Sequence, residues 1–143
     1  MVVRKKDGIA RICVDYCRLS DVTKKAAHSP PRIDDIFDAL RSAKYFSTLD
    51  LEGGFHQVLV DKSDQEKTGF VTLWGHFEYT VTSFGLCNAP VIFQGLMALV
   101  FWGLIGIDCL IYLDDIIIFG PTFDLHIILL EKVFAQLQNK SED

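Results

Sequence analysis

Cysteine is scarce in this sequence and is not spaced for metal binding. The 143 residues contain four cysteines, which form no C-x-x-C pair and have no histidine cluster to match them: Cys13, Cys17, Cys87 and Cys109. This pattern argues against a zinc site and against a disulfide framework. We therefore expect reduced, mostly buried thiols in an intracellular protein. The N-terminus also lacks the apolar run of a signal peptide, so secretion is not expected.

Positive charge is missing from a long central stretch of the chain. No Lys or Arg lies between Lys67 and Lys132. Residues 1–45 hold ten Lys and Arg against six Asp and Glu, whereas residues 46–143 hold four against thirteen, and the net charge is −5. A basic segment beside an acidic one suits a polyanion bridged by metal ions. On charge alone, an ordinary solvated surface is the simpler interpretation.

Charge of either sign is absent from residues 86–107, and these 22 residues are long enough to cross a bilayer. Asn88, Pro90, Gln94 and three glycines interrupt the stretch, however, and neither flank has the Lys or Arg that orients a membrane helix. A buried helix followed by a loop explains it better. A small membrane protein remains the weaker alternative.

The remaining pattern predicts one α+β domain with an antiparallel sheet and helices on one of its faces. Hydrophobic spacing predicts helices over residues 32–44, 90–100 and 124–138. Alternating or continuous apolar runs predict a strand over residues 45–51 and hairpins over residues 70–81 and 109–119. A further hairpin is expected around the turn at residues 5–8, and residues 61–67 are expected to form a polar turn.

The hairpin at residues 109–119 carries two adjacent carboxylates, Asp114 and Asp115, between two apolar arms. Two like charges against apolar strands repel each other and resist desolvation, so they favour a bound cation. Asp50 also ends an apolar strand. If that strand lies beside the hairpin, three carboxylates meet at one end of a sheet, and these are the oxygen ligands that Mg²⁺ prefers. A simple turn remains the alternative for the Asp-Asp pair alone.

Eight short blocks follow one another between residues 3 and 119: VRKKDG at 3–8, VDY at 14–16, PRIDDIFDAL at 31–40, FSTLDLEGGFHQV at 46–58, KTGF at 67–70, GHFEY at 75–79, FGLCNAPVIFQGLM at 84–97 and YLDDIIIF at 112–119. Together they resemble the fingers and palm of a reverse transcriptase from a long-terminal-repeat retrotransposon of the Ty3/gypsy type. The resemblance implies an α+β fold whose antiparallel palm sheet packs on helices. It assigns about 1–45 and 62–80 to the fingers and about 46–61 and 81–143 to the palm. The thumb, connection and ribonuclease H regions are expected to be absent from this chain.

The resemblance also implies a function, that of an RNA-directed DNA polymerase. Such a nucleotidyltransferase joins a deoxynucleoside triphosphate to a primer 3′-hydroxyl by two-metal catalysis, with Mg²⁺ or, as a substitute, Mn²⁺. The implied partners are an RNA or DNA template-primer duplex, the deoxynucleoside triphosphate and the remaining polyprotein domains, and no membrane. The implied location is a cytoplasmic particle or the nucleus.

Carried over by position, Asp50, Asp114 and Asp115 match the family's metal-binding catalytic aspartates, and the backbone carbonyl of Leu51 would complete the shell of one ion. Phe55 falls where the family keeps an aromatic ring that closes on the sugar and excludes a ribose 2′-hydroxyl. A phenylalanine that only packs in the core is an equally good interpretation of Phe55.

Further contacts to the nucleotide and the primer follow from the same resemblance. Phe84 and Gly85 match the loop that supports the incoming nucleotide. Arg11, with Lys5 or Lys6, matches the contacts to the triphosphate, and the chemistry of these cations suits phosphate. Tyr112 would lie near the primer end, or would pack across the strands of its hairpin.

Some positions depart from the family's pattern, and several of them lose positive charge: Cys17, Ser20, Glu52, Val71, Leu73, Thr82, Ser83 and Gly95. Fewer cations on a surface that follows a nucleic-acid backbone would weaken binding there. The sequence therefore leaves two principal hypotheses. One is a polymerase domain; the other is a catalytically dead, transposon-derived remnant with residual nucleic-acid binding.

Overall fold

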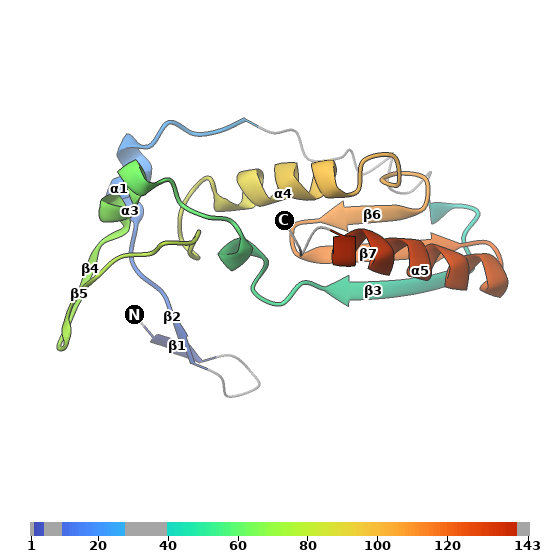
Figure 1. The fold of residues 1–143 in the computed structure, drawn as a ribbon, viewed down its shortest axis with the longest axis horizontal. Helices are drawn as coiled ribbons and strands as arrows, with labels where there is room; N and C mark the ends of the chain where they lie inside the picture. The colour runs from blue at the N-terminus through green and yellow to red at the C-terminus, as the bar shows by residue number, and fades with distance from the viewer. Residues whose placement is uncertain (1, 5–9, 28–39, 140–143) are drawn as a thin grey trace. The chain divides into compact units, whose positions relative to one another are not determined.

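A computed structural model describes residues 2–4, 10–27 and 40–139. The chain divides into two compact units, which are shown in Figure 1. Unit 1 comprises Met1–Ala26 and Gly53–Ile92, and unit 2 comprises Ala27–Glu52 and Phe93–Asp143. The turn expected at residues 5–8 and most of the helix expected over residues 32–44 lie outside the described residues. The division into fingers and palm at the boundaries given above stays a prediction.

Unit 2 is built on a three-stranded antiparallel sheet. Its strands are β3 (Tyr45–Asp50), β6 (Cys109–Tyr112) and β7 (Asp115–Gly120), in the order β3-β7-β6. Strands β6 and β7 form the predicted hairpin, and β3 pairs with β7 from Tyr45 opposite Gly120 to Asp50 opposite Asp115. The predicted strand over residues 45–51 is therefore placed beside the predicted hairpin.

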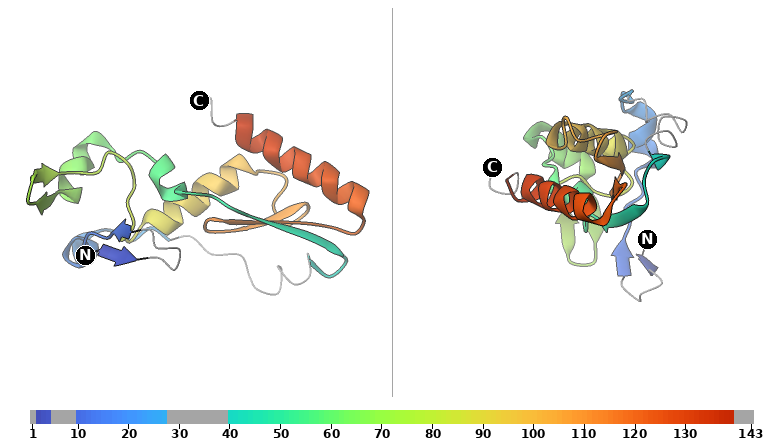
Figure 2. Two further views of the ribbon diagram at one scale, coloured as in Figure 1. Left: turned by 90° about the horizontal axis from the view of Figure 1, so that it is seen from below. Right: turned by 90° about the vertical axis from the view of Figure 1, so that its right-hand side faces the viewer.

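Two helices accompany this sheet, α4 (Ala89–Val100) and α5 (Phe123–Asn139), close to their predicted bounds. Helix α5 runs along one face of the sheet, as Figure 2 shows. The side chains of Ser47 and His126 are hydrogen-bonded across that face, with 2.8 Å between Oγ and Nε2. A Cβ atom on Gly120 would lie 3.3 Å from the Cα of His126, so β7 and α5 approach closely because Gly120 has no side chain.

The core of unit 2 lies between the sheet and the helices. Phe101, Ile116, Ile118 and Val133 have no exposed surface. Successive side chains of a strand point to opposite faces, so Ile116 and Ile118 share the face of β7 that carries Gly120. The amide of Gln136 on α5 donates a hydrogen bond of 2.6 Å to the backbone carbonyl at the end of α4. The two helices are thereby joined to each other as well as to the sheet.

Unit 1 consists of short elements. Strands β1 (Val2–Arg4) and β2 (Ala10–Ile12) pair with each other, and β4 (Phe70–Thr72) pairs with β5 (Gly75–Phe77). Three of its helical elements have six residues or fewer: α1 (Cys17–Val22), the 3₁₀ turn η1 (Gly54–Gln57) and α3 (Lys62–Gln65). A second 3₁₀ turn, η2 (Glu66–Thr68), follows α3 directly.

Several sequence-based expectations needed correction. Residues 61–67 are not simply a polar turn, because Asp61 accepts a hydrogen bond of 2.9 Å from the Ser63 N–H and so caps helix α3. The hairpin expected over residues 70–81 is shorter, because β4 and β5 pair only from Phe70 opposite Phe77 to Thr72 opposite Gly75, with the turn at Leu73 and Trp74. The four cysteines, all in the described part of the chain, form no disulfide and are not mostly buried, since only Cys109 is buried.

The uncharged stretch over residues 86–107 forms α4, which has 12 residues, and then a series of turns. None of the helices formed by the described residues is long and apolar enough to span a bilayer.

Candidate active site

The predicted catalytic aspartates lie at one end of the sheet in unit 2. Asp50 is the last residue of β3, and its partner in the strand register is Asp115, the first residue of β7. Residues directly opposite each other in an antiparallel pair project to the same face, with Cβ atoms about 4.5–5.5 Å apart. Both carboxylates are exposed to solvent. They lie on the face opposite to Ser47 and α5, because the side chains of a strand alternate.

Asp114 lies in the two-residue loop that joins β6 and β7, and Tyr112 pairs with Asp115 across the loop. The backbone carbonyl of Asp114 accepts a hydrogen bond of 3.0 Å from the N–H of Leu51. This bond extends the pairing of β3 and β7 past Asp50. The backbone of all four predicted metal-binding residues is therefore fixed by neighbouring strands.

The turn itself contains a residue in an unfavourable conformation. Leu113 has a φ of 54°, the one positive value among the described residues other than glycine. The left-handed region costs a bulky side chain about 1–2 kcal/mol. Of the two aspartates only Asp114 is in the loop, so the expectation that both form the tip of the hairpin is off by one residue. The shift puts Asp115 into the strand, where it faces Asp50.

Gln94 on α4 holds this turn in place, and the sequence analysis assigned it no role. Its side-chain oxygen accepts a hydrogen bond of 2.9 Å from the Leu113 N–H, and its amide donates one of 3.2 Å to the Ile111 carbonyl. A single side chain thus satisfies backbone groups on both sides of Tyr112. The available signal was a polar, uncharged residue in the middle of an apolar helix.

The donor set at this end of the sheet fits a hard divalent cation chemically. Carboxylates from two adjacent strands project to one face, and a bound cation would remove the repulsion between them. In the part of the chain that the structure describes, however, no group of three His, Cys, Asp or Glu side chains is arranged to hold a metal ion. The pairing of Asp50 with Asp115 is therefore the geometric core of the site.

The residues predicted to contact the nucleotide lie in unit 1. Phe55, on η1, is 8% exposed, and its ring packs edge-to-face on Phe84 with centroids 5.2 Å apart. His56 makes a similar contact with Phe84 at 5.4 Å. Phe55 thus has the packing expected of a core residue. The same contact with Phe84 would also support, from behind, a ring that closes on a sugar.

Gly85 follows Phe84 at a point where no other residue fits easily. Its φ is +98°, and a Cβ atom there would lie 3.2 Å from the carbonyl oxygen of Val14. Both the backbone conformation and the lack of space call for glycine. This glycine allows the loop after Ser83 to pass close to the segment that leads into α1.

The remaining predicted contacts are Arg11 with Lys5 or Lys6, and Tyr112. Arg11 lies on β2, where only the backbone is described, and Lys5 and Lys6 lie outside the described residues. Tyr112, the last residue of β6, is 56% exposed and pairs with Asp115 in the register. Its side chain is therefore beside Asp115 and open to solvent.

Comparison with known proteins identifies the family. Residues 3–141 match the family described as "Reverse transcriptase (RNA-dependent DNA polymerase)". The chain is 42% identical over 109 residues to an RNA-directed DNA polymerase homolog of Oenothera berteroana, which covers 76% of this chain and 77% of that protein. It is 40% identical over 127 residues to the retrovirus-related Pol polyprotein from transposon 297 of Drosophila melanogaster, covering 89% of this chain and 12% of the polyprotein.

Another relative is the retrovirus-related Pol polyprotein from transposon gypsy of the same organism, 38% identical over 117 residues. The predicted resemblance to the gypsy type is thus confirmed. The chain spans 12% and 13% of the length of two transposon polyproteins that it matches, those of 297 and opus.

Solved structures confirm the fold class. The structure of the foamy viral protease-reverse transcriptase in complex with double-stranded DNA matches with a TM-score of 0.86 and 28% identity, over 96% of this chain and 24% of that one. The structure of the same viral enzyme with an RNA/DNA hybrid matches with a TM-score of 0.82 and 28% identity, over 96% and 18%. The α+β palm sheet packed on helices is as predicted, and the chain belongs to the reverse transcriptase (RNA-dependent DNA polymerase) family.

Proposed function

We propose that this chain carries the catalytic centre of an RNA-directed DNA polymerase. The observation that carries the proposal is the register of β3 and β7, which sets Asp50 opposite Asp115 with Asp114 next to it. In the reaction, a primer 3′-hydroxyl attacks the α-phosphorus of a deoxynucleoside triphosphate. A new phosphorus–oxygen bond forms, the bond between the α- and β-phosphates breaks, and pyrophosphate leaves.

Asp50 and Asp115, which lie opposite each other, would hold a Mg²⁺ or Mn²⁺ ion; the resemblance adds Asp114 and the carbonyl of Leu51 as ligands, and a second ion. When bound, such ions activate the attacking hydroxyl and neutralise charge on the leaving pyrophosphate. The protein's own contribution is placement, because strand pairing and the bonds of Gln94 keep the carboxylates in position before the substrates arrive.

The remaining roles are proposed for residues of unit 1. Phe55, supported by Phe84, would close on the sugar of the incoming nucleotide, and Gly85 would let its loop come close to that nucleotide. Arg11, with Lys5 or Lys6, would bind the triphosphate. Tyr112, exposed beside Asp115, would contact the primer end of an RNA or DNA template-primer duplex.

A second candidate function is that of a non-catalytic remnant that retains the fold and weak nucleic-acid binding. The observation in its favour is the surface of the β4–β5 hairpin. Val71 is 69% exposed and Leu73 is 96% exposed, at positions where the resemblance leads us to expect basic or polar side chains. Apolar groups there cannot neutralise phosphates, so binding to a duplex would lose part of its electrostatic component.

Primer extension separates the two candidates. An oligo-dT primer on poly-rA is incubated with the 143-residue chain, thymidine triphosphate and Mg²⁺. Low salt and excess duplex are used because the chain is expected to bind the duplex weakly. The polymerase proposal predicts slow extension that Asp115→Asn abolishes. Asp124→Asn on α5, an exposed acid away from the aspartates, is the matched control and should extend as the parent does. Extension that is absent, or equal in all three proteins, would support the remnant.

A further inference from the structure

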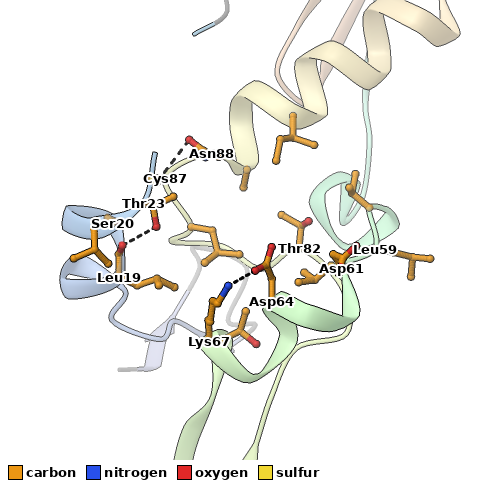
Figure 3. Close-up of a pocket in the computed structure, with 17 residues that line it drawn as sticks. Leu19, Ser20, Thr23, Leu59, Asp61, Asp64, Lys67, Thr82, Cys87 and Asn88 are labelled. Atoms are coloured by element: carbon orange, nitrogen blue, oxygen red, sulfur yellow. Dashed lines mark hydrogen bonds and ion pairs between the residues drawn. The ribbon is translucent and has the colours of Figure 1, made fainter. Parts of the chain in front are cut away.

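A cavity of about 570 Å³ lies within unit 1, apart from the three aspartates. Figure 3 shows it between α1, the segment around Leu59 and the start of α4. Small-molecule sites have volumes of roughly 300–1,000 Å³ and mostly apolar walls. The apolar part of this wall comes mainly from Leu19, Val22, Val58, Leu59, Leu86 and Ile92.

The charged groups of the wall are already paired with neighbours. Lys67 forms an ion pair with Asp64 at the rim. The carboxylate of Asp61 accepts hydrogen bonds from the N–H and the hydroxyl of Ser63, at 2.9 Å and 2.7 Å. Thr68 donates its hydroxyl proton to the carbonyl of Gln65 at 2.6 Å. An anionic ligand would therefore have to break the Lys67–Asp64 pair in order to be neutralised, whereas a neutral ligand would not.

The cavity is held open by a specific polar contact. The side-chain oxygen of Asn88 accepts a hydrogen bond of 3.0 Å from the N–H of Ala26, and its amide donates one of 2.9 Å to the carbonyl of Lys24. These bonds tie the segment after α1 to the residues just before α4. A preformed cavity of this kind avoids the entropic cost of ordering its walls around a ligand.

The rim exposes apolar side chains to water. Val22 is 82% exposed, Leu59 is 78% exposed and Ile92 is 47% exposed. Covering such groups contributes about 25 cal/mol for each Å² of apolar surface removed from water. A ligand that fills the cavity and touches this rim would gain its affinity from these contacts.

We propose that this cavity is a binding site for a neutral, largely apolar small molecule containing one or two rings. The volume sets the size of the ligand and the apolar wall sets its polarity, and the one cation among the described lining residues is already paired with Asp64, which disfavours an anion. This inference does not rest on the polymerase function. It concerns a part of unit 1 that contains none of the residues assigned above to catalysis or nucleotide binding.

A ligand in the cavity would also affect the contact between Phe55 and Phe84. Val58 lines the cavity and accepts a hydrogen bond of 2.7 Å from the N–H of Thr82, which also lines it. Phe55 lies three residues before Val58, and Phe84 lies two residues after Thr82. A ligand against this paired segment would therefore stiffen the backbone that carries the Phe55–Phe84 contact. An effect of this stiffening on nucleotide binding would rest on the proposed function, because it is there that Phe55 and Phe84 are assigned to the nucleotide.

The first test is a fluorescence titration of the full chain with 6-propionyl-2-(dimethylamino)naphthalene, a neutral two-ring apolar probe. We expect saturable binding that Leu59→Glu weakens about tenfold, because a charge at the rim loses hydration when the probe covers it. Leu73→Glu is the matched control, since Leu73 is 96% exposed in the same unit but does not line the cavity. Its affinity should stay within about twofold of the parent. Non-saturable binding, or equal losses in both variants, would overturn the proposal.

The second test uses the cysteines as internal reporters and needs no substitution. Cys87 lines the cavity and is partly buried, whereas Cys17 is exposed and does not line it. The probe should slow alkylation of Cys87 by N-ethylmaleimide several-fold, as followed by peptide mass spectrometry, and leave Cys17 unchanged. Equal protection of both thiols, or of neither, would contradict a ligand in this cavity.

A final measurement distinguishes a small ligand from an apolar side chain of a second copy. If copies of the chain filled the cavity, the apparent affinity for the probe would fall as protein concentration rises, and that result would overturn the proposal. With a small-molecule site, affinity is independent of protein concentration. Hydrogen exchange at the Thr82 amide should then slow on probe binding while exchange within β4 and β5 stays the same.

Discussion

The two units are stabilised in different ways. In the described part of the chain, eleven of the fourteen buried apolar residues belong to unit 2, and three belong to unit 1: Tyr16, Phe55 and Ala89. Burial of apolar side chains against the sheet therefore stabilises unit 2 and gives it a closely packed core. Asp50 and Asp115 lie at the end of that sheet, on its paired strands, and Asp114 lies in the loop next to them.

Unit 1 relies more on hydrogen bonds between side chains and backbone. The buried hydroxyl of Tyr16 donates a hydrogen bond of 2.9 Å to the carbonyl of Thr68, and the hydroxyl of Thr68 accepts one of 2.8 Å from the N–H of Tyr79. Each such bond contributes about 1 kcal/mol. Unit 2, which carries the aspartates, is thus stabilised mainly by its apolar core. Unit 1, which contains the cavity, is stabilised more by polar contacts.

The largest effect that we predict is on the core of unit 2. Phe101→Ala should lower the free energy of unfolding by about 3–5 kcal/mol, because it leaves a cavity beside fully buried neighbours. Trp102→Ala is the matched control, since Trp102 is 84% exposed, and should change it by no more than about 0.5 kcal/mol. Urea denaturation measures both. Similar losses in the two variants would contradict the placement of the core.

Stability at alkaline pH should depend on the same core. Burial raises the pKa of the Cys109 thiol from 9.0 to about 11. Between these values the unfolded chain loses the thiol proton while the folded chain keeps it, so stability falls as pH rises. The loss should reach about 2–3 kcal/mol by pH 11 and be absent below pH 9. Cys109→Ala should remove this part of the slope in urea denaturation at a series of pH values. An unchanged slope would show that the thiol ionises freely in the folded protein.

In unit 1 a smaller loss is expected from one hydrogen bond. Tyr16→Phe removes the hydroxyl and leaves the carbonyl of Thr68 without that donor, which should cost about 1–2 kcal/mol. Tyr45→Phe, at a residue that is 42% exposed, is the control and should cost less than about 0.5 kcal/mol. Hydrogen exchange at the Tyr79 amide reports the local effect. If the two variants behaved alike, the account of unit 1 would be wrong.

A still smaller effect is expected at the strained turn beside the aspartates. Leu113→Gly should be more stable than Leu113→Ala by about 1 kcal/mol, because only glycine adopts a φ of 54° without penalty. Both substitutions remove the atoms of leucine beyond Cβ, so the difference isolates the effect of a Cβ atom on this backbone conformation. Thermal denaturation of the pair measures it. An alanine variant as stable as the glycine variant would mean that the turn is not strained.

Much of unit 2 could be predicted from its sequence. The apolar runs that end in Asp50 and flank Asp114 are strands, largely buried in β6 and β7 but not in β3, and the spacing of apolar residues located α4 and α5 to within one residue at each end. What the sequence could not supply is the order of the strands, since no local pattern says that β3 pairs with β7. The resemblance to reverse transcriptases supplied the expectation that Asp50 lies near Asp114 and Asp115.

Unit 1 was predicted less well, for a physical reason. Helix α1 has no buried residue, so it shows no apolar stripe that a sequence reading could detect. Helix α3 is a single turn begun by the Asp61 cap. The role of Gln94 was missed as well, because a side chain that binds the backbone of a distant turn leaves no periodic signal.

The central claim is that Asp50 and Asp115 face each other and share a divalent cation. It is tested most directly by measuring the free energy of unfolding with and without Mg²⁺. Without metal, Asp115→Asn should stabilise the chain by about 0.2–1 kcal/mol, since it removes a repulsion between opposite residues. At ten times the dissociation constant, Mg²⁺ should add about 1.4 kcal/mol to the parent and to Asp124→Asn, and nothing to Asp115→Asn. Equal stabilisation of all three proteins by Mg²⁺, or of none, would contradict the claim.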